Sequence, residues 1–275
     1  MSIKSILVHL ADDRAHVKRL DVGFELAHRF GAHLSALYVT TPVSMPAAIT
    51  GRGASHAYTA QALEHNRATA ARLEVEFNER CRRQGLACEW RCETGDHLEC
   101  LDVHSRYADL AIVSPGKSKS LEDQIALVMP EQLPLTSTCP VLIVPDAWTG
   151  KTVGTRALIS WKSTRESART VHGAVPLLSK ANAVRVVTVG AEGDDHLPGA
   201  EIATYLARHG ITVEVAALAG HDERVGDVIL ADAKESGADL LVMGAYGHHR
   251  LRELVFGGTT RHILYHATLP LLMMH

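Results

Sequence analysis

A glycine-spaced segment near the C-terminus has the residue types and spacing of an anion pocket. Residues 244–260 read GAYGHHRLRELVFGGTT, between the apolar run DLLVMG and the helix-like run TTRHILYHA. Glycines let the backbone approach a ligand with no Cβ in the way, and the unpaired N–H groups at a helix N-terminus favour phosphate. The order strand, loop, helix therefore predicts a phosphate-binding loop. The alternative is a glycine-rich turn whose helix is capped by Thr259 or Thr260.

The second half of the chain repeats the first. A shift of 130 positions sets ADLAIVSPG, which begins at Ala108, against ADLLVMGAYG, which begins at Ala238, and it sets CPVLIVP against LPLLMMH. Further upstream ILVHL matches ALISW with an offset near 150. The chain is therefore a tandem repeat with an insertion of about twenty residues in its first half. The insertion includes residues 41–61, a stretch of Pro, Gly, Ser and Ala that we expect to be a mobile loop.

The two copies are not chemically equivalent. The four glycines of the second copy stand opposite Ser114, Lys117, Leu127 and Val128 in the first. Pro134 stands opposite Leu264, where a proline inside the final helix would remove a hydrogen bond. We therefore expect only the second half to bind a ligand.

Length and composition indicate two compact domains. A chain of 275 residues that is 46% hydrophobic can bury two cores, one in each half, and we place the domains at residues 1–147 and 154–275. The net charge of −3 argues against a nucleic-acid-binding surface. The sequence shows neither an apolar run of roughly 20 residues nor a signal peptide, so we expect no membrane partner and a cytoplasmic location.

All five cysteines lie in the first half and form no CxxC pair, so we expect reduced thiols rather than a disulfide framework. One alternative is a zinc site, because Cys88, Cys92, His97 and Cys100 are close together and are all competent ligands. Cys88 and Cys92 also alternate with Trp90 as one face of a strand, which favours a core role.

Apolar strand-like runs alternate with helical runs in both halves. This order predicts right-handed crossovers and a parallel sheet covered by helices on both faces. The expected fold class is α/β, with two tandem doubly wound parallel-sheet domains of five strands each. In such sheets ligands bind at the carboxyl ends of the strands, where the loop after DLLVMG lies.

The tandem layout, the segment ADLLVMGAYGHHRLRELVFGGTTRHIL and the terminal strand resemble the universal stress protein family, in its two-domain form. The resemblance implies adenine nucleotide alpha hydrolase-like domains, a degenerate first copy, and ATP, with magnesium as an accompanying ion, in the second. Members of this kind carry an acid at the end of the first strand, where this half has Lys162, and Gly258 intervenes before Thr259. The site that the resemblance implies consists of Trp161, Lys162, Val189, Met243, Gly244, Gly247, His248, Arg250, Gly257, Gly258, Thr259 and Thr260.

Two function classes stay open. The first is a regulatory module of a stress response that binds ATP without efficient chemistry, and the alternative is a slow ATP hydrolase or an adenylyl-transfer enzyme of the same fold. The sequence contains no HxGH, SGGxDS, HExxH or GxSxG signature, so we assign no catalytic residue and favour the binding module. We expect the halves to form an intramolecular pseudo-dimer through the strands VLIVP and LLMMH, a shape that is also compatible with homo-oligomers.

Overall fold

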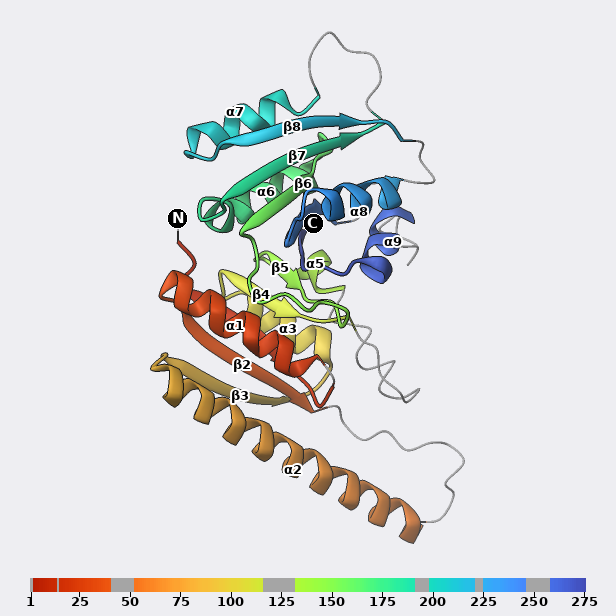
Figure 1. Ribbon diagram of the computed structural model, residues 1–275. Coiled ribbons are helices and arrows are strands. Elements are labelled where there is room, and N and C mark those ends of the chain that lie inside the picture. The colour runs from red at the N-terminus through yellow and green to blue at the C-terminus, as the bar shows by residue number, and fades with distance from the viewer. Residues whose placement is uncertain are drawn as a thin grey trace.

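A computed structural model describes residues 2–13, 15–40, 52–115, 132–190, 198–220, 225–245 and 258–275 (Figure 1). The first half contains β1 (Ser5–Leu10), α1 (His16–Phe30), β2 (His33–Thr40), α2 (Arg52–Gln84), β3 (Cys88–Thr94), α3 (His97–Ser105), β4 (Leu110–Val113), α5 (Leu133–Thr136) and β5 (Val141–Ile143). The second half contains β6 (Arg156–Ser160), α6 (Arg165–Leu178), β7 (Ala183–Val189), α7 (Ala200–Arg208), β8 (Val213–Leu218), α8 (Val225–Glu235), β9 (Leu240–Gly244), α9 (Gly258–His266) and β10 (Leu271–Met274). The alternating α/β order predicted from the sequence is confirmed.

The described strands form one sheet in the order β3-β2-β1-β4-β5-β10-β9-β6-β7-β8. Strand pairs within each half are parallel, whereas β5 and β10 pair antiparallel, with Leu271 opposite Ile143 and Met273 opposite Val141. An antiparallel contact between equivalent strands is the contact of a two-fold axis. The two halves therefore pair as two copies of a single-domain protein would, through the two strands expected from the sequence.

The hydrophobic core consists of two layers, one on each face of the sheet. Residues of α1, α2, α6 and α7 cover one layer, and residues of α3, α5, α8 and α9 cover the other. Side chains alternate along a strand, so Ile6 and Ile159 enter the first layer while Leu7 and Leu158 enter the second. Each layer contains residues of both halves.

Helix α2 begins at Arg52, so residues 52–61 are helical, and the loop predicted there is wrong. Residues 41–51 of the predicted loop lie outside the described part of the chain. The stretch includes Ala54, Ala57 and Ala60, and alanine is the best helix former. Adding a residue to an existing helix gains one hydrogen bond without a new nucleation cost, so composition alone underestimated the helix.

Pro134 shortens the last helix of the first half. It lies in the first turn of α5, which has only four residues, whereas α9 at the equivalent place has nine. A first-turn proline has no N–H to lose from the helix, so the chain accommodates Pro134 by beginning the helix beside it.

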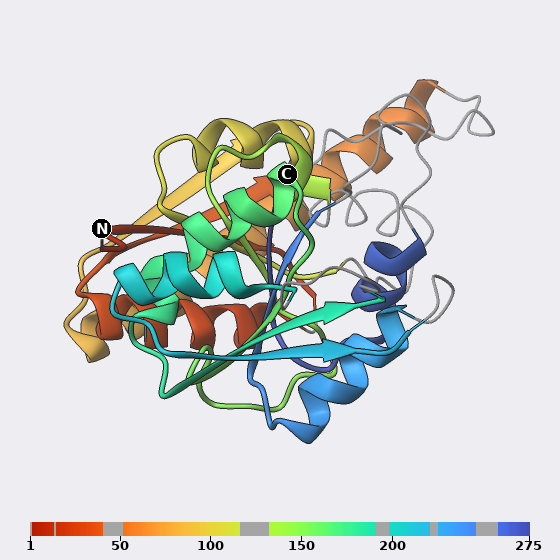
Figure 2. The same ribbon diagram turned by 90° about the horizontal axis from the view of Figure 1, so that it is seen from above.

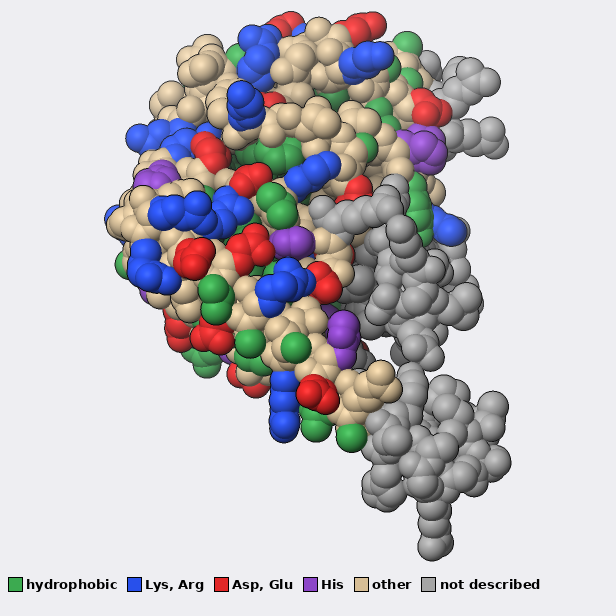
Figure 3. Space-filling view, turned by 60° about the horizontal axis from the view of Figure 1, so that its bottom comes forward, with side chains coloured by type: hydrophobic (Ala, Val, Ile, Leu, Met, Phe, Trp, Pro, Cys, Tyr) green, Lys and Arg blue, Asp and Glu red, His purple; other side chains and the backbone are tan. Residues whose placement is uncertain are grey.

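Charges of both signs mix on the described surface. On the face drawn in Figure 3, Lys and Arg side chains alternate with Asp and Glu, in agreement with the net charge of −3. No helix among the described residues is both long enough and apolar enough to cross a bilayer.

Candidate functional site

Strand ends of the second half meet at one edge of the sheet. Parallel strands end on the same side, and Figure 2 shows β7 and β8 pointing to the side where α9 lies. Trp161 follows β6 and donates its backbone N–H to Val187 O at 2.8 Å, while Met243 pairs with Ser160. Five predicted site residues lie on these strand ends or directly after them: Trp161, Lys162, Val189, Met243 and Gly244.

The residues at these strand ends differ in solvent exposure. Met243 is buried, Trp161 and Val189 are half-buried, and Lys162 is exposed. Val189 also contacts the loop after β8, because a Cβ built at Gly220 would lie 2.5 Å from its Cγ1. The edge therefore offers partly exposed apolar surface with a cation beside it.

Gly244 is required for helix packing. A Cβ at this position would lie 2.7 Å from the backbone nitrogen of Ser167 and 2.9 Å from the carbonyl carbon of Glu166. Real Cβ atoms do not come this close to backbone, so β9 can meet the first turn of α6 only through glycine. The sequence predicted a close backbone approach here, and the structure shows that the approaching backbone is that of α6.

The N-terminus of α6 is already satisfied by the protein. Thr164 caps the helix, with the Ser167 N–H donating to its Oγ1 at 3.4 Å. The Glu166 backbone N–H, the Thr164 hydroxyl, and the charges of His275 and Arg165 lower the pKa of the Glu166 carboxyl. An internal carboxylate therefore occupies the positive end of the α6 dipole.

At the N-terminus of α9, by contrast, no described residue occupies the space beside Gly258. Gly258 is exposed, and a Cβ built there would meet no heavy atom within 4 Å among the described residues. Thr259 is half-buried and Thr260 is buried, so the first turn of the helix is fixed in place. The remaining predicted site residues lie outside the part of the chain that the structure describes: Gly247, His248, Arg250 and Gly257.

The strand register shows which residues of the second half correspond to Asp12 and Asp13 of the first half. Ile6 pairs with Leu110, and Ala157 pairs with Leu240, which sets Ile6 and Ala157 at equivalent places. Counting along the chain from there, Ser163 and Thr164 correspond to Asp12 and Asp13. Hydroxyl groups therefore replace carboxylates in the second half, and they still accept hydrogen bonds.

The corresponding edge of the first half is filled by its own side chains. Asp13 accepts the Ala15 N–H at 2.8 Å through Oδ1 and pairs through Oδ2 with the buried Arg19 at 2.8 Å. Asp12 pairs with Arg72 of α2 at 2.6 Å. Ser114, which stands where the second half has Gly244, is buried with no hydrogen-bond partner for its hydroxyl in the described structure.

Cys81 and Cys88 form a disulfide, so the expectation that all five thiols are reduced is wrong. The turn at Gly85 ends α2 and brings the two Cα atoms to 6.2 Å. In the sequence, Cys81 and Cys88 stand on either side of Gly85, the glycine that ends the helix. This arrangement favours a disulfide, which the odd number of cysteines did not suggest.

The four candidate zinc ligands do not gather. Cys88 is in the disulfide, Cys92 is exposed, and His97 Nδ1 lies 3.2 Å from His9 Nε2. Among the described residues, the structure brings together no group of three or more His, Cys, Asp or Glu side chains able to hold a metal ion.

Sequence reasoning also missed a pair of equivalent carboxylates. Asp109 accepts the backbone N–H groups of Lys4 and Ser5, at 2.7 and 3.0 Å. Asp239 accepts those of Thr155 and Arg156, at 3.1 and 2.8 Å, and also the Thr155 hydroxyl. Both follow alanine and precede a buried strand in the repeated ADL tripeptide, a signal that the alignment contained.

Comparison with known proteins agrees with this architecture. Residues 165–275 match the model of the Universal stress protein family. The second half of the chain belongs to this family. Universal stress protein Slr1230 of Synechocystis is 37% identical over 92 residues, which cover 32% of this chain and 31% of that protein, so the match spans about a third of the relative.

Solved structures extend the likeness in fold to the whole chain. A universal stress protein from Archaeoglobus fulgidus DSM 4304 has a TM-score of 0.77 at 17% identity, over 98% of this chain and 95% of that one. A putative universal stress protein from Pseudomonas aeruginosa UCBPP-PA14 has a TM-score of 0.62 at 18% identity, over 99% and 93% of the two chains. The tandem universal stress protein fold predicted from the sequence is confirmed.

Proposed function

We propose that the second half binds an adenine nucleotide, ATP, at the carboxyl edge of β6, β7 and β9. The protein then acts in a stress response as a binding module whose state depends on the nucleotide. The proposal is supported most by the N-terminus of α9, where no described residue fills the space beside Gly258, while the N-terminus of α6 and the edge of the first half are occupied by the protein's own groups. A helix N-terminus that meets a strand edge favours phosphate.

Each described residue has a role in this proposal. The backbone N–H groups of Gly258, Thr259 and Thr260 donate to phosphate oxygens, and the exposed Lys162 supplies positive charge to them. The half-buried Trp161 and Val189 offer apolar surface for the base. Magnesium would enter on the phosphates, its usual partners in such sites.

Residues outside the described part of the chain complete the proposed site. Gly247, His248, Arg250 and Gly257 belong to it on the strength of the motif, as does the expectation of one nucleotide per chain. The buried Met243 and the packed Gly244 hold the end of β9 in position and contribute no donor to the phosphates.

Substitution at Gly258 tests the proposal. A Cβ at Gly258 would meet no described heavy atom within 4 Å, and the carboxylate of Gly258→Asp at a helix N-terminus stabilises the helix by about 0.3–1 kcal/mol. The same carboxylate repels phosphate, so we expect calorimetric titration to show at least a tenfold loss of ATP affinity. Gly258→Ala, which adds no charge, should retain affinity.

Three results would contradict the proposal. They are an unchanged dissociation constant for Gly258→Asp, two equivalent sites per chain, and no binding of ATP by the intact protein. Nucleotide released on denaturation of freshly purified protein provides an independent measurement that needs no variant.

A further inference from the structure

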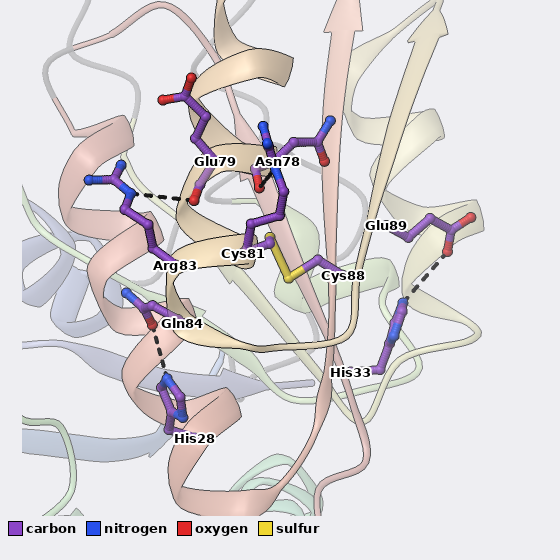
Figure 4. Close-up of a disulfide and its surroundings, with 10 residues drawn as sticks. His28, His33, Asn78, Glu79, Cys81, Arg83, Gln84, Cys88 and Glu89 are labelled. Carbon is purple, nitrogen blue, oxygen red and sulfur yellow. Dashed lines mark hydrogen bonds and ion pairs between the residues drawn. A yellow bond between two sulfur atoms is a disulfide. The ribbon is translucent and has the colours of Figure 1, made fainter.

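The disulfide joins the end of a helix to the edge of the sheet. Cys81 lies in the last turn of α2, and Cys88 is the first residue of β3, the edge strand (Figure 4). Between them the chain turns at Gly85, with a φ of 63°. The Leu86 N–H closes the turn by donating to Cys81 O at 3.2 Å.

Cys81 is the last of the few buried contacts of α2. The buried residues of this helix are spaced by four, which places them on one stripe: Thr69, Leu73, Phe77 and Cys81. Phe77 packs near Phe24 and Trp90, with ring centroids 6.0 and 6.1 Å away. Among the side chains described from Ala60 to Ala68 none is buried, and Figure 1 shows α2 extending beyond the sheet.

The remaining described contacts of α2 are polar and non-covalent. Arg72 and Asp12 form an exposed ion pair at 2.6 Å, which contributes little to stability. Nearer the C-terminal end of the helix, the half-buried Arg80 pairs with Asp21 at 2.5 Å, and Gln84 Oε1 lies 3.0 Å from His28 Nε2. The disulfide is the covalent attachment of this end of the helix.

Solvent reaches the disulfide from one side. A surface depression is lined by Asn78, Cys81, Arg82, Gly85, Leu86 and Cys88. Cys81 is 6% exposed, whereas Cys88 is half-buried, so Cys88 is the more accessible of the two cysteines. The exposed Arg82 adds positive charge beside a helix end that otherwise disfavours a thiolate.

The three other cysteines are poorly placed for this chemistry. Cys139 is buried, and burial raises the pKa of its thiol. Burial, together with nearby carboxylates such as that of Glu93, raises the pKa of the Cys92 and Cys100 thiols as well. Raised pKa values leave few thiolates among these three cysteines that could attack the Cys81–Cys88 disulfide themselves.

We propose that the Cys81–Cys88 bond is a thiol–disulfide exchange site for small anionic thiols, and that opening it releases the end of α2 from β3. The incoming thiolate attacks Sγ of Cys88, forming a mixed disulfide and breaking the Cys81–Cys88 bond, and Cys81 leaves as a thiolate that takes up a proton. A second small thiol attacks the mixed disulfide, leaving as the oxidised dimer, and Cys88 is protonated. Two small thiols are thus oxidised while the protein disulfide gains two electrons and two protons.

Single-cysteine variants test the direction of attack. Native Cys81→Ala and Cys88→Ala proteins are incubated with oxidised glutathione, and the mixed disulfide is followed by intact mass. Because Cys88 is the more exposed of the two cysteines that line the depression, Cys81→Ala should react at Cys88 at least about tenfold faster than Cys88→Ala reacts at Cys81. Equal rates, or reaction only after unfolding in urea, would overturn the proposal.

The intact chain provides the second measurement. Reduction should speed amide hydrogen exchange over residues 78–90 and lower the melting temperature by about 5 °C, while exchange in β5 and β10 stays unchanged. Cys139→Ala, which keeps the disulfide, is the matched control and should respond to reduction as the parent does. Unchanged exchange over residues 78–90 in the reduced protein, or five alkylatable thiols in protein exposed to oxidised glutathione, would also refute it.

Discussion

At the scale of single residues, two glycines of the same predicted motif differ in their surroundings. Gly244 touches the backbone of α6, whereas a Cβ at Gly258 would meet no described heavy atom within 4 Å. We expect Gly244→Ala to lower the free energy of unfolding by about 1–3 kcal/mol, because neither β9 nor α6 can move freely. Gly258→Ala should leave it unchanged or raise it by up to about 1 kcal/mol, since alanine favours helix. Urea unfolding of the pair measures the difference, and equal effects would contradict it.

A buried histidine makes stability depend on pH. Burial, then the charges of Arg19 and His97, holds the pKa of His9 well below its usual value, and burial lowers the pKa of His97 despite the opposing charge of Asp96. As the pH falls, the unfolded chain therefore binds protons at His9 and His97 that the folded chain does not bind. Stability should fall as the pH drops below about 6.5, by on the order of 1.4 kcal/mol per pH unit for each such proton.

His9→Gln isolates this contribution. The amide of glutamine can replace the contact of His9 with His97 without titrating. The slope of the unfolding free energy against pH, between about pH 6.5 and pH 5, should therefore decrease by the contribution of one proton, about 1.4 kcal/mol per pH unit. His33, whose side chain is 41% exposed, is changed to Gln as the control for the substitution itself. A slope that His9→Gln does not change would show that other groups cause it.

Sequence patterns identified important residues, but they did not predict the contacts that make these residues important. The spacing of glycines identified Gly244, but its partner Ser167 is distant in the sequence, and no local pattern reports that contact. Asp12 and Asp13 follow the end of β1 closely. Their neutralisation by Arg72 and Arg19 depends on how two helices pack against that strand, which a linear motif does not encode.

At the scale of elements, the spacing of apolar residues and the positions of glycine and proline predicted most helices and strands. Gly31 ends α1 with a φ of 60°, the left-handed conformation that glycine adopts readily. The start of α2 was missed because Gly, Ser and Ala occur in loops as well as in helix extensions. Composition cannot separate the two cases without the packing of the helix that follows.

Equivalent carboxylates at the start of β4 and β9 hold the first strand of each half. We expect Asp239→Ala, which removes a half-buried acceptor of two backbone N–H groups, to cost about 1.5–3 kcal/mol. Asp109 is exposed, so Asp109→Ala should cost only about 1 kcal/mol. The sites lie in different halves, and the double variant should show the sum to within about 0.5 kcal/mol in denaturant titration. A strongly non-additive result would mean that the hydrogen bonds of Asp109 and Asp239 are energetically coupled.

At the scale of the molecule, the two halves share their cores. Each hydrophobic layer contains residues of both halves and passes across the β5–β10 contact. Gly173 of α6 also lets the halves approach, since a Cβ there would lie 2.4 Å from Pro140. We therefore expect one cooperative unfolding transition, with calorimetric and van't Hoff enthalpies equal. Two resolved transitions would show that the halves are independent despite the continuous sheet.

Removal of β10 tests the contact directly. Leu271, Leu272 and Met273 are fully buried between β5 and β9, and loss of each such side chain costs about 2–5 kcal/mol. Three losses together match the total stability of a typical domain, about 5–15 kcal/mol, so deleting residues 271–275 should abolish the cooperative transition and enlarge the radius measured by small-angle scattering. Met274→Lys, at the half-buried end of the strand, should keep both. A truncated chain with the parent's melting temperature and radius would show that the halves associate through another surface.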